Sequence, residues 1–477
     1  MKVHSGSAAF AMYTITGVAS AVISFITMII LTRTASEVFF GQINKFITAS
    51  NVVMSLICLG LDSAYIRFYY EPPKGTNCKQ LAWKCIVPAL TILFLISFVI
   101  MLFRNNSLQV TLLGSGGGLF SAAFVITVFS QFLYRFLTIY FRMESKVLSF
   151  SIVSIVFVLL TKSIFIPIYY LTSNFKNNII IAAIFLTAFM LGYFLLNMKN
   201  IIEIPRHLHA DYRPVYRYAL LSSPVFVITY LNSYLPQVII SKNLGDSALG
   251  IYSAALLFCS AILVLSTGFT TFWSPFMFKN YKVEQDTIKR IHDVVLLVSI
   301  LAMSSILIFN DFVYLFIGEN FRRNQNILGM LLVYPIILIV VETVACGINI
   351  EKKNEIRLII YLISTITNVA LCFVLISKYG LDGIAFASMI SAIVQMVLMT
   401  YFGQKYYCSI NSIIRTLFHI FVLILSAVLF YIFYNNRIVF IATEIAITVV
   451  CLFYDKDVVL WIFKILQSKR LGNDEKN

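Results

Sequence analysis

Several charged side chains of this 477-residue chain lie inside long apolar stretches, where a charge needs a specific reason to be present. Lys45, Arg135 and Lys162 are basic, and Glu342 stands in the run Ile-Val-Val-Glu-Thr-Val-Ala. A charge within a bilayer is costly unless it faces a hydrated cleft, so each is a candidate functional group. The cations suit an anionic ligand. The acid suits either a proton or sodium site or a partner for a nearby cation.

Two of these basic residues also have a simpler interpretation. Lys45 lies about one helical turn into its apolar run and could snorkel to the outer interface. Arg135 lies close to the predicted cytoplasmic end of its run, where arginine is common in membrane proteins. Arg67 and Asp62 are near enough along one predicted helix to form a network at its end, and a purely structural role is the alternative.

The surrounding elements are apolar helices. Hydrophobic residues make up 60% of the chain, charged residues 12%, and the mean hydropathy is +0.89, which excludes an ordinary soluble domain. Runs of about 20 residues can cross a bilayer as helices. The sequence predicts 14 of them, at residues 10–32, 41–66, 82–103, 117–139, 148–171, 178–198, 216–240, 248–274, 291–310, 327–349, 357–377, 381–402, 413–434 and 438–454.

Connections between these runs reach only about 15 residues, so no extramembrane catalytic domain is expected. Backbone groups in a bilayer must be hydrogen-bonded internally, which predicts an all-α membrane helical bundle. We expect a protein that is not an enzyme and has no catalytic residues, cofactor or metal. The eight cysteines form no CxxC pair and mostly lie in apolar runs, as small core residues do.

The basic residues are distributed asymmetrically. With the N-terminus in the cytoplasm, 26 of the 36 fall on the cytoplasmic side and 9 on the outer side, Lys45 being inside a span. This bias predicts a multi-pass protein with both termini in the cytoplasm. The net charge of +15 is therefore attributed to contact with anionic lipids and not to nucleic-acid binding. A polyanionic ligand is a second possible reason for this charge.

The chain also contains an internal repeat. Arg33, Glu37 and Gly41 match Lys242, Asp246 and Gly250 at one offset of 209 residues, with six predicted helices between the copies. An even number of helices gives a parallel repeat about an axis normal to the membrane. We expect an N-lobe at 1–205, a C-lobe at 206–405 around a central cleft, and an appended pair of helices with a tail at 406–477.

Three segments resemble one family. They are Glu-Val-Phe-Phe-Gly at 37–41 followed by Leu-Gly-Leu-Asp-Ser-Ala-Tyr-Ile-Arg at 59–67, Leu-Gly-Asp-Ser-Ala-Leu-Gly-Ile-Tyr-Ser-Ala-Ala at 244–255, and Tyr-Gly-Leu-Asp-Gly-Ile-Ala-Phe-Ala-Ser at 379–388. In this order they are similar to the Wzx-type oligosaccharide flippases of the multidrug/oligosaccharidyl-lipid/polysaccharide exporter superfamily. The resemblance implies that an undecaprenyl-diphosphate-linked oligosaccharide is flipped across the bacterial cytoplasmic (inner) membrane, from its inner to its outer leaflet. It leaves the glycan open.

Such cargo would require cations for the diphosphate and polar or aromatic groups for the sugars. The candidate substrate-binding residues are Lys45, Arg67, Arg135, Lys162, Tyr230, Asn232, Tyr234 and Gln237, and the ion-coupling candidate is Glu342. Tyr230, Tyr234 and Gln237 share one helical face, which could contact sugars or pack against another helix. A proton or sodium ion, a polysaccharide polymerase and chain-length proteins are further candidate partners.

Two other functions remain open. A drug or organic-cation antiporter of the same superfamily would favour acids and aromatic residues in its cleft, whereas here the cations are at least as prominent. A flippase for lipid II or a teichoic-acid precursor would need the same phosphate-binding groups. A glycan polymerase or ligase is disfavoured, because the longest outer connection, at 311–326, is short.

Overall fold

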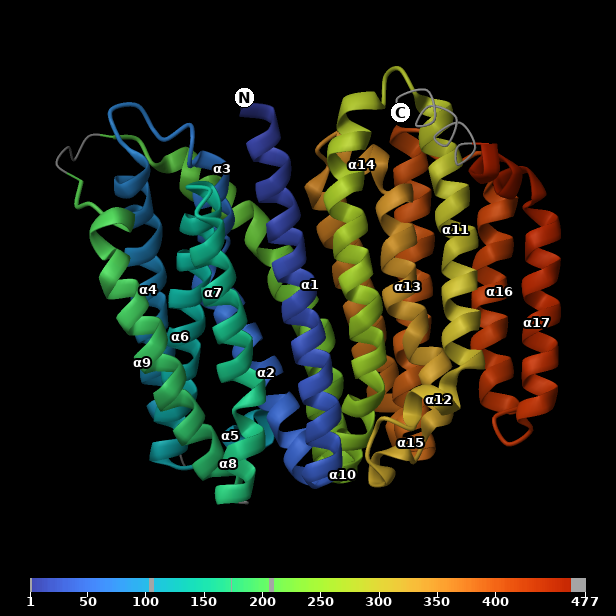
Figure 1. Cartoon of the computed structure of the whole chain (residues 1–477), viewed down its shortest axis with the longest axis horizontal. Coiled ribbons are helices and arrows are strands. Elements are labelled where there is room, and N and C mark those ends of the chain that lie inside the picture. Colours follow the sequence, from blue (N-terminus) through green and yellow to red (C-terminus); the bar gives the residue numbers. More distant parts are fainter. Residues whose placement is uncertain (1, 103–106, 173, 206–209, 465–477) are drawn as a thin grey trace. The chain divides into compact units, whose positions relative to one another are not determined.

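The computed structural model describes the chain except residues 1, 103–106, 173, 206–209 and 465–477, and the described residues are helical with no strand among them (Figure 1). The chain forms two compact parts, which we describe separately. The first part comprises residues 1–257 with Ile317–Phe321, and the second part comprises Phe258–Phe316 with the chain from Arg322 onward.

The first part contains α1 (Lys2–Thr34), α2 (Glu37–Cys58), α3 (Leu61–Phe68), α4 (Cys78–Leu102), α5 (Ser107–Leu113), α6 (Gly118–Met143), α7 (Val147–Val158), a π-helical turn (Leu159–Ser163), α8 (Phe165–Leu171), α9 (Phe175–Ile201) and the beginning of α10 (Arg213–Asn280). The second part contains the rest of α10, α11 (Gln285–Ile308), α12 (Asn310–Tyr314), α13 (Leu328–Val344), α14 (Cys346–Ile350), α15 (Asn354–Tyr406), α16 (Ile413–Ile432) and α17 (Arg437–Tyr454). Short 3-10 turns lie at Glu319–Arg322 and Gln325–Ile327.

The helices account for the predicted spans. Among the described residues, 11 helices are long and apolar enough to cross a membrane, and α2 with α3 forms a further span that bends by 57°. α10 and α15 each continue through a glycine with non-helical backbone, Gly245 and Gly380, so each provides two of the predicted spans. With these divisions the helices match all 14 predicted runs, and the all-α membrane bundle is confirmed.

One helix forms the core of each part. In the first part α6 packs against α2, α4, α7 and α9, and it buries phenylalanines throughout its length, namely Phe120, Phe124, Phe132, Phe136 and Phe141 (Figure 1). In the second part α13 packs against α11, α15 and α16. The C-terminal helices α16 and α17 pack against each other and against α11. Burial of these central helices fixes the positions of the polar side chains that they carry.

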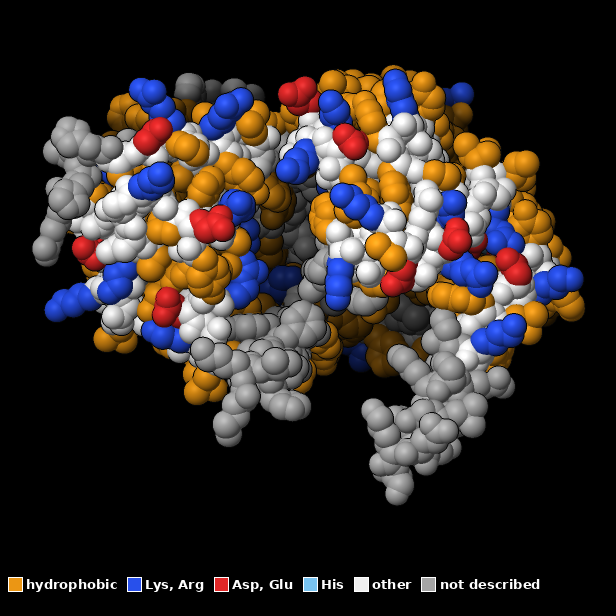
Figure 2. Space-filling view, turned by 90° about the horizontal axis from the view of Figure 1, so that it is seen from above, with side chains coloured by type: hydrophobic (Ala, Val, Ile, Leu, Met, Phe, Trp, Pro, Cys, Tyr) orange, Lys and Arg blue, Asp and Glu red, His pale blue; other side chains and the backbone are white. Residues whose placement is uncertain are grey.

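Hydrogen bonds and ion pairs link the connections at the ends of each part. In the first part, the hydroxyl of Tyr69 donates a hydrogen bond of 2.5 Å to Glu144, which joins the α3–α4 and α6–α7 connections at one end. In the second part, Tyr407 donates to the carbonyl of Tyr281 at 2.8 Å, and Arg437 pairs with Asp311 at 2.9 Å at the opposite end. Figure 2 shows Lys and Arg side chains spread over the described surface of each part in that view.

The orientation of these ends gives a direct prediction. A cysteine introduced at Arg322 or Arg437 should react with a membrane-impermeant thiol reagent added outside intact cells. A cysteine at Lys74 or Arg206 should react only after the membrane is made permeable, because basic connections are retained in the cytoplasm. Outside labelling at Arg206, which lies beyond the described residues, would overturn both the span count and the orientation.

Candidate functional site

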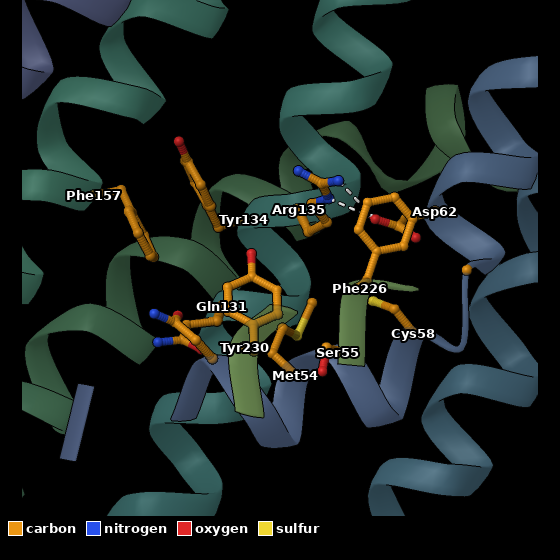
Figure 3. Close-up of a pocket in the computed structure, with 12 residues that line it drawn as sticks. Met54, Ser55, Cys58, Asp62, Gln131, Tyr134, Arg135, Phe157, Phe226 and Tyr230 are labelled. Atoms are coloured by element: carbon orange, nitrogen blue, oxygen red, sulfur yellow. Dashed lines mark hydrogen bonds and ion pairs between the residues drawn. The ribbon is translucent and has the colours of Figure 1, made fainter. Parts of the chain in front are cut away.

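The first part contains a cavity of about 190 Å³ that has both polar and apolar walls (Figure 3). Its walls come from α2, the α2–α3 bend, α6, α7 and the beginning of α10. The lining residues are Asn51, Met54, Ser55, Cys58, Gly60, Asp62, Gln131, Tyr134, Arg135, Phe157, Phe226 and Tyr230. The cavity therefore brings together two of the predicted site residues, Arg135 and Tyr230.

Arg135 and Asp62 form the charged end of this cavity. The Nε of Arg135 donates a hydrogen bond of 2.8 Å to Oδ2 of Asp62, and a terminal guanidinium nitrogen lies 2.7 Å from the same oxygen. About half of the Arg135 side chain remains exposed, whereas Asp62 is largely buried. The guanidinium has five N–H donors, so this contact leaves donors free for an anion in the cavity.

The bend between α2 and α3 positions Asp62. Leu59 and Gly60 both have left-handed backbone, with φ of 39° and 74°. Left-handed backbone favours glycine. A Cβ at Gly60 would also lie 2.3 Å from the carbonyl oxygen of Ala219 in α10. Glycine at position 60 thus permits both the bend and the close approach of α10, and Asp62 follows in the first turn of α3.

Neutral polar and aromatic groups line the rest of the cavity. Gln131 donates from Nε2 to Ser50 at 2.8 Å, while its buried Oε1 has no protein hydrogen-bond partner. Tyr134 stacks on Phe157 with 3.8 Å between ring centroids. The ring of Tyr230 lies between Gln131 and the Arg135–Asp62 pair in Figure 3. A guanidinium beside amide, phenol and ring faces can bind a ligand that combines an anion with hydroxyl groups.

Lys162 lines a second cavity of the first part, about 220 Å³ in volume. It is located in the π-helical turn between α7 and α8, and its ammonium donates a hydrogen bond to Ser24 of α1. The structure thus places Lys162 against a cavity, as predicted. It lies apart from Arg135, which lines the first cavity only.

Lys45 is buried in an ion-paired cluster and lines neither of these two cavities. Its Nζ donates to Ser241 at 2.5 Å and lies 3.2 Å from Oδ1 of Asp246, while Gln42 donates to the other carboxylate oxygen at 3.0 Å. With 1% of the residue exposed, Lys45 does not snorkel to an interface. In this conformation it joins α2 to α10 on either side of the Gly245 break.

The two copies of the sequence repeat meet at this cluster. A Cβ at Gly41 would lie 2.3 Å from the carbonyl oxygen of Asp246, and a Cβ at Gly250 would lie 2.1 Å from that of Glu37. The offset of 209 relates Glu37 to Asp246 and Gly41 to Gly250, so the two contacts are equivalent under the repeat. Such reciprocal contacts are typical of elements related by a two-fold axis.

Of the two roles predicted for Arg67 and Asp62, the structure does not show the network between them. Arg67 pairs with Glu71 at 3.1 Å, one turn further along the chain, and both side chains are more than half exposed. Asp62 pairs with Arg135, because the bend turns its carboxylate toward α6. Arg67 does not line the Arg135 cavity.

The predicted polar face of α10 divides between different surroundings. Tyr230 lines the Arg135 cavity, but Tyr234 donates its hydroxyl to the carbonyl of Leu112 at 2.6 Å and lines an apolar cavity of about 350 Å³. Gln237 is buried and donates to Thr48 of α2 at 3.2 Å. Asn232 is also buried. Interhelical packing therefore explains Tyr234 and Gln237 in this conformation, and Tyr230 remains a candidate sugar contact.

Glu342 pairs with a cation of the second part. Its Oε1 lies 3.4 Å from a guanidinium nitrogen of Arg357, which also donates to Asn349 at 3.1 Å. Its main-chain carbonyl accepts a hydrogen bond from Trp273 at 3.0 Å. Of the two roles predicted for Glu342, the structure shows the partner for a cation.

Sequence reasoning missed Asn51 and Gln131. Both amides line the Arg135 cavity and the Lys162 cavity, and both lie deep in predicted spans where uncharged apolar residues dominate. An amide in a span is itself a signal of an interhelical or ligand contact. The prediction considered the charged residues in these spans and therefore left the amides out.

The fold is that of a class of membrane transporters. The lipid II flippase MurJ in an inward closed conformation matches with a TM-score of 0.67 at 14% identity, over 94% of this chain and 100% of that chain. An inward-facing multidrug resistance MATE family transporter of the MOP superfamily matches with a TM-score of 0.62 at 14% identity, over 82% and 97%. The MATE multidrug transporter DinF-BH in complex with R6G matches with a TM-score of 0.59 at 14% identity, over 82% and 92%.

Within this class the sequence identifies the family. The model of the polysaccharide biosynthesis protein family matches residues 8–281, more than half of the chain, and the chain belongs to that family. No curated protein sequence matches it. The predicted resemblance to polysaccharide exporters of the MOP superfamily is confirmed.

Proposed function

We propose that this protein moves a polyprenyl-diphosphate-linked oligosaccharide, the repeat unit of a surface polysaccharide, from the inner to the outer leaflet of the bacterial cytoplasmic membrane. Membership of the polysaccharide biosynthesis family supports a cargo that contains a glycan. The Arg135 cavity is the observation that carries the proposal. A half-exposed guanidinium next to Tyr230 and Gln131 fits a diphosphate joined to sugars.

The carboxylate of this cavity argues for an anionic cargo over an organic cation. Asp62 is the cavity's acid, and Arg135 already neutralises it. A cationic drug would therefore have to displace the guanidinium. A diphosphate can instead bind the donors of Arg135 that face the cavity. A lipid II or teichoic-acid precursor shares the diphosphate chemistry and differs in the glycan, which makes it the closest alternative.

Alternating access between the lobes at 1–205 and 206–405 is the proposed mechanism, with both termini and the Arg135 end in the cytoplasm. The headgroup enters from the cytoplasm and meets Arg135, and the polyprenyl tail stays in lipid. In this proposal the cluster of Lys45, Asp246, Gly41 and Gly250, which joins α2 to α10, has the role of closing the outer side. Separation of this cluster then releases the headgroup to the outer leaflet, where a polymerase and chain-length proteins would receive it.

Deletion in the native bacterium tests the proposal. Lipid-linked oligosaccharide should accumulate in the inner leaflet and the surface glycan should disappear, while peptidoglycan synthesis and sensitivity to cationic drugs stay unchanged. Loss of peptidoglycan synthesis would instead identify a lipid II carrier. Unchanged surface glycan with altered drug resistance would identify an antiporter.

The ion pair of Glu342 gives a separate prediction. We expect Glu342→Gln to lower the midpoint of thermal unfolding by a few degrees, because the half-buried Arg357 loses its counter-charge. The dependence of cargo transport on proton and sodium gradients should be the same in Glu342→Gln as in the wild type. Adding Arg357→Gln should restore part of the stability. A variant that binds cargo but ignores the gradient would show that Glu342 is the coupling site.

A further inference from the structure

Unlike Lys45, Arg135 and Arg357, Lys162 has no carboxylate partner among the described residues. Lys45 pairs with Asp246, Arg135 with Asp62, and Arg357 with Glu342. The described contact of the Lys162 ammonium is the hydrogen bond to the hydroxyl of Ser24. A hydroxyl orients an ammonium but supplies no counter-charge, so an anion is the missing partner.

The π-helical turn places this ammonium. Pro167 lacks an N–H, and in a regular helix its ring would clash with the carbonyl of Ser163. The chain instead widens by one residue over Leu159–Ser163, where the N–H of Ile164 bonds the carbonyl of Leu159 at 2.9 Å. Ser163 and Thr27 then join their hydroxyls at 2.7 Å, which holds the turn against α1. Turns of this type recur at functional sites because they redirect a side chain.

The cavity at Lys162 adjoins the one at Arg135. Both are lined by Asn51, Gln131 and Phe157, so these three side chains form a common wall within the first part. The buried Oε1 of Gln131 has no protein partner. A headgroup bound at Arg135 thus has a neighbouring cavity that offers amides and an uncompensated cation.

We propose that Lys162 is a second binding station for a phosphate-bearing headgroup, which passes from the Arg135 cavity along Asn51 and Gln131 into the Lys162 cavity. The inference rests on the proposed function, because it assumes that the cargo carries a diphosphate. Binding there would supply the missing counter-charge and bring the headgroup deeper into the first part. The phosphate could belong to the cargo or to a membrane phospholipid.

Binding of farnesyl diphosphate to the purified full chain tests the station. In phosphatidylcholine vesicles, Lys162→Met should weaken binding by about tenfold, since one charge-assisted contact is lost, and Lys162→Arg should retain most of it. Lys176→Met is the matched control, because it removes one exposed lysine from the α9 end without touching either cavity. Equal affinities of wild type and Lys162→Met would overturn the proposal.

Two further readouts separate the sources of failure. If the wild type itself does not bind farnesyl diphosphate, the proposed cargo class is wrong, whatever the role of Lys162. If phosphatidylglycerol co-purifies with the wild type, is lost in Lys162→Met and is not displaced by farnesyl diphosphate, the station holds a phospholipid and the transfer of cargo is overturned. Competition between the two ligands at Lys162 supports the proposal, because both present the same phosphate chemistry.

Discussion

Replacing Arg135 with alanine is expected to abolish surface glycan without lowering the amount of protein in the membrane. Arg135 is the basic residue that lines the cavity in Figure 3, and about half of its side chain is exposed. Losing charge-assisted hydrogen bonds to a diphosphate costs about 1.5–3 kcal/mol, or roughly ten- to a hundredfold in affinity. Arg135→Lys should retain part of the function, because a point cation replaces the planar fork imperfectly.

Asp62 allows this effect to be separated from simple loss of an ion pair. If Arg135 served only to neutralise Asp62, the double variant Arg135→Ala with Asp62→Asn would recover function, since no unpaired carboxylate would remain. If Arg135 binds the cargo, the double variant stays inactive, and Asp62→Asn alone keeps transport because it frees the guanidinium. Complementation of a deletion strain at native expression measures all four proteins. Recovery in the double variant would place the diphosphate site elsewhere.

The helices could be predicted from the sequence because their signal is local. Apolar runs of bilayer length give the spans directly, and the bias of basic residues fixes their alternation. The structure adds what a run of residues does not specify, such as the merging of spans through Gly245 and Gly380. It also shows the widened turn at Lys162, which depends on Pro167 several residues later.

The site could be predicted only in part, because partners are set by tertiary structure. A charge in an apolar run identified Arg135 and Lys162, and both lie against cavities. The partner of Asp62 lies 73 residues away on another helix, whereas Arg67 was closer along the chain and the more obvious choice. Lys45 and Asp246 are 201 residues apart, and sequence spacing does not reveal such a pair.

Residues that share one face of α10 lie in different surroundings in the structure. Tyr230 and Tyr234 lie one turn apart on α10, yet only Tyr230 reaches the polar cavity, since Tyr234 packs against α5. The periodicity of a helix specifies direction but not depth within the bundle, nor what the neighbouring helix presents there. The prediction of sugar-binding residues from spacing alone therefore included Tyr234 and Gln237, which pack between helices, together with Tyr230, which lines the cavity.

The repeat-related glycines give the second large effect. Gly41→Ala and Gly250→Ala should each prevent closure of the outer side, because the new Cβ would lie 2.3 Å or 2.1 Å from a backbone oxygen that no rotamer change can move away. Overpacking of this kind costs about 1–3 kcal/mol, which disfavours the closed state by roughly five- to a hundredfold. Transport should fall accordingly, because the cytoplasmic side cannot open while the outer side remains open.

Accessibility distinguishes a failed seal from a misfolded protein. In a chain whose native cysteines, including Cys58 of the cavity, are replaced by serine and which carries Asn51→Cys, an impermeant thiol reagent added outside should label the cavity faster when Gly41→Ala is present. Labelling should be equally fast with Gly250→Ala, because the repeat makes the two contacts equivalent. Gly192→Ala is the control, since no atom lies within 4 Å of its added Cβ, and it should change neither labelling nor transport. Lys45→Met should also increase labelling, as Asp246 loses its ammonium partner while the glycine contact remains. Unchanged labelling in both alanine variants, with transport lost, would show that the contact between the repeats stabilises the fold and does not close the outer side.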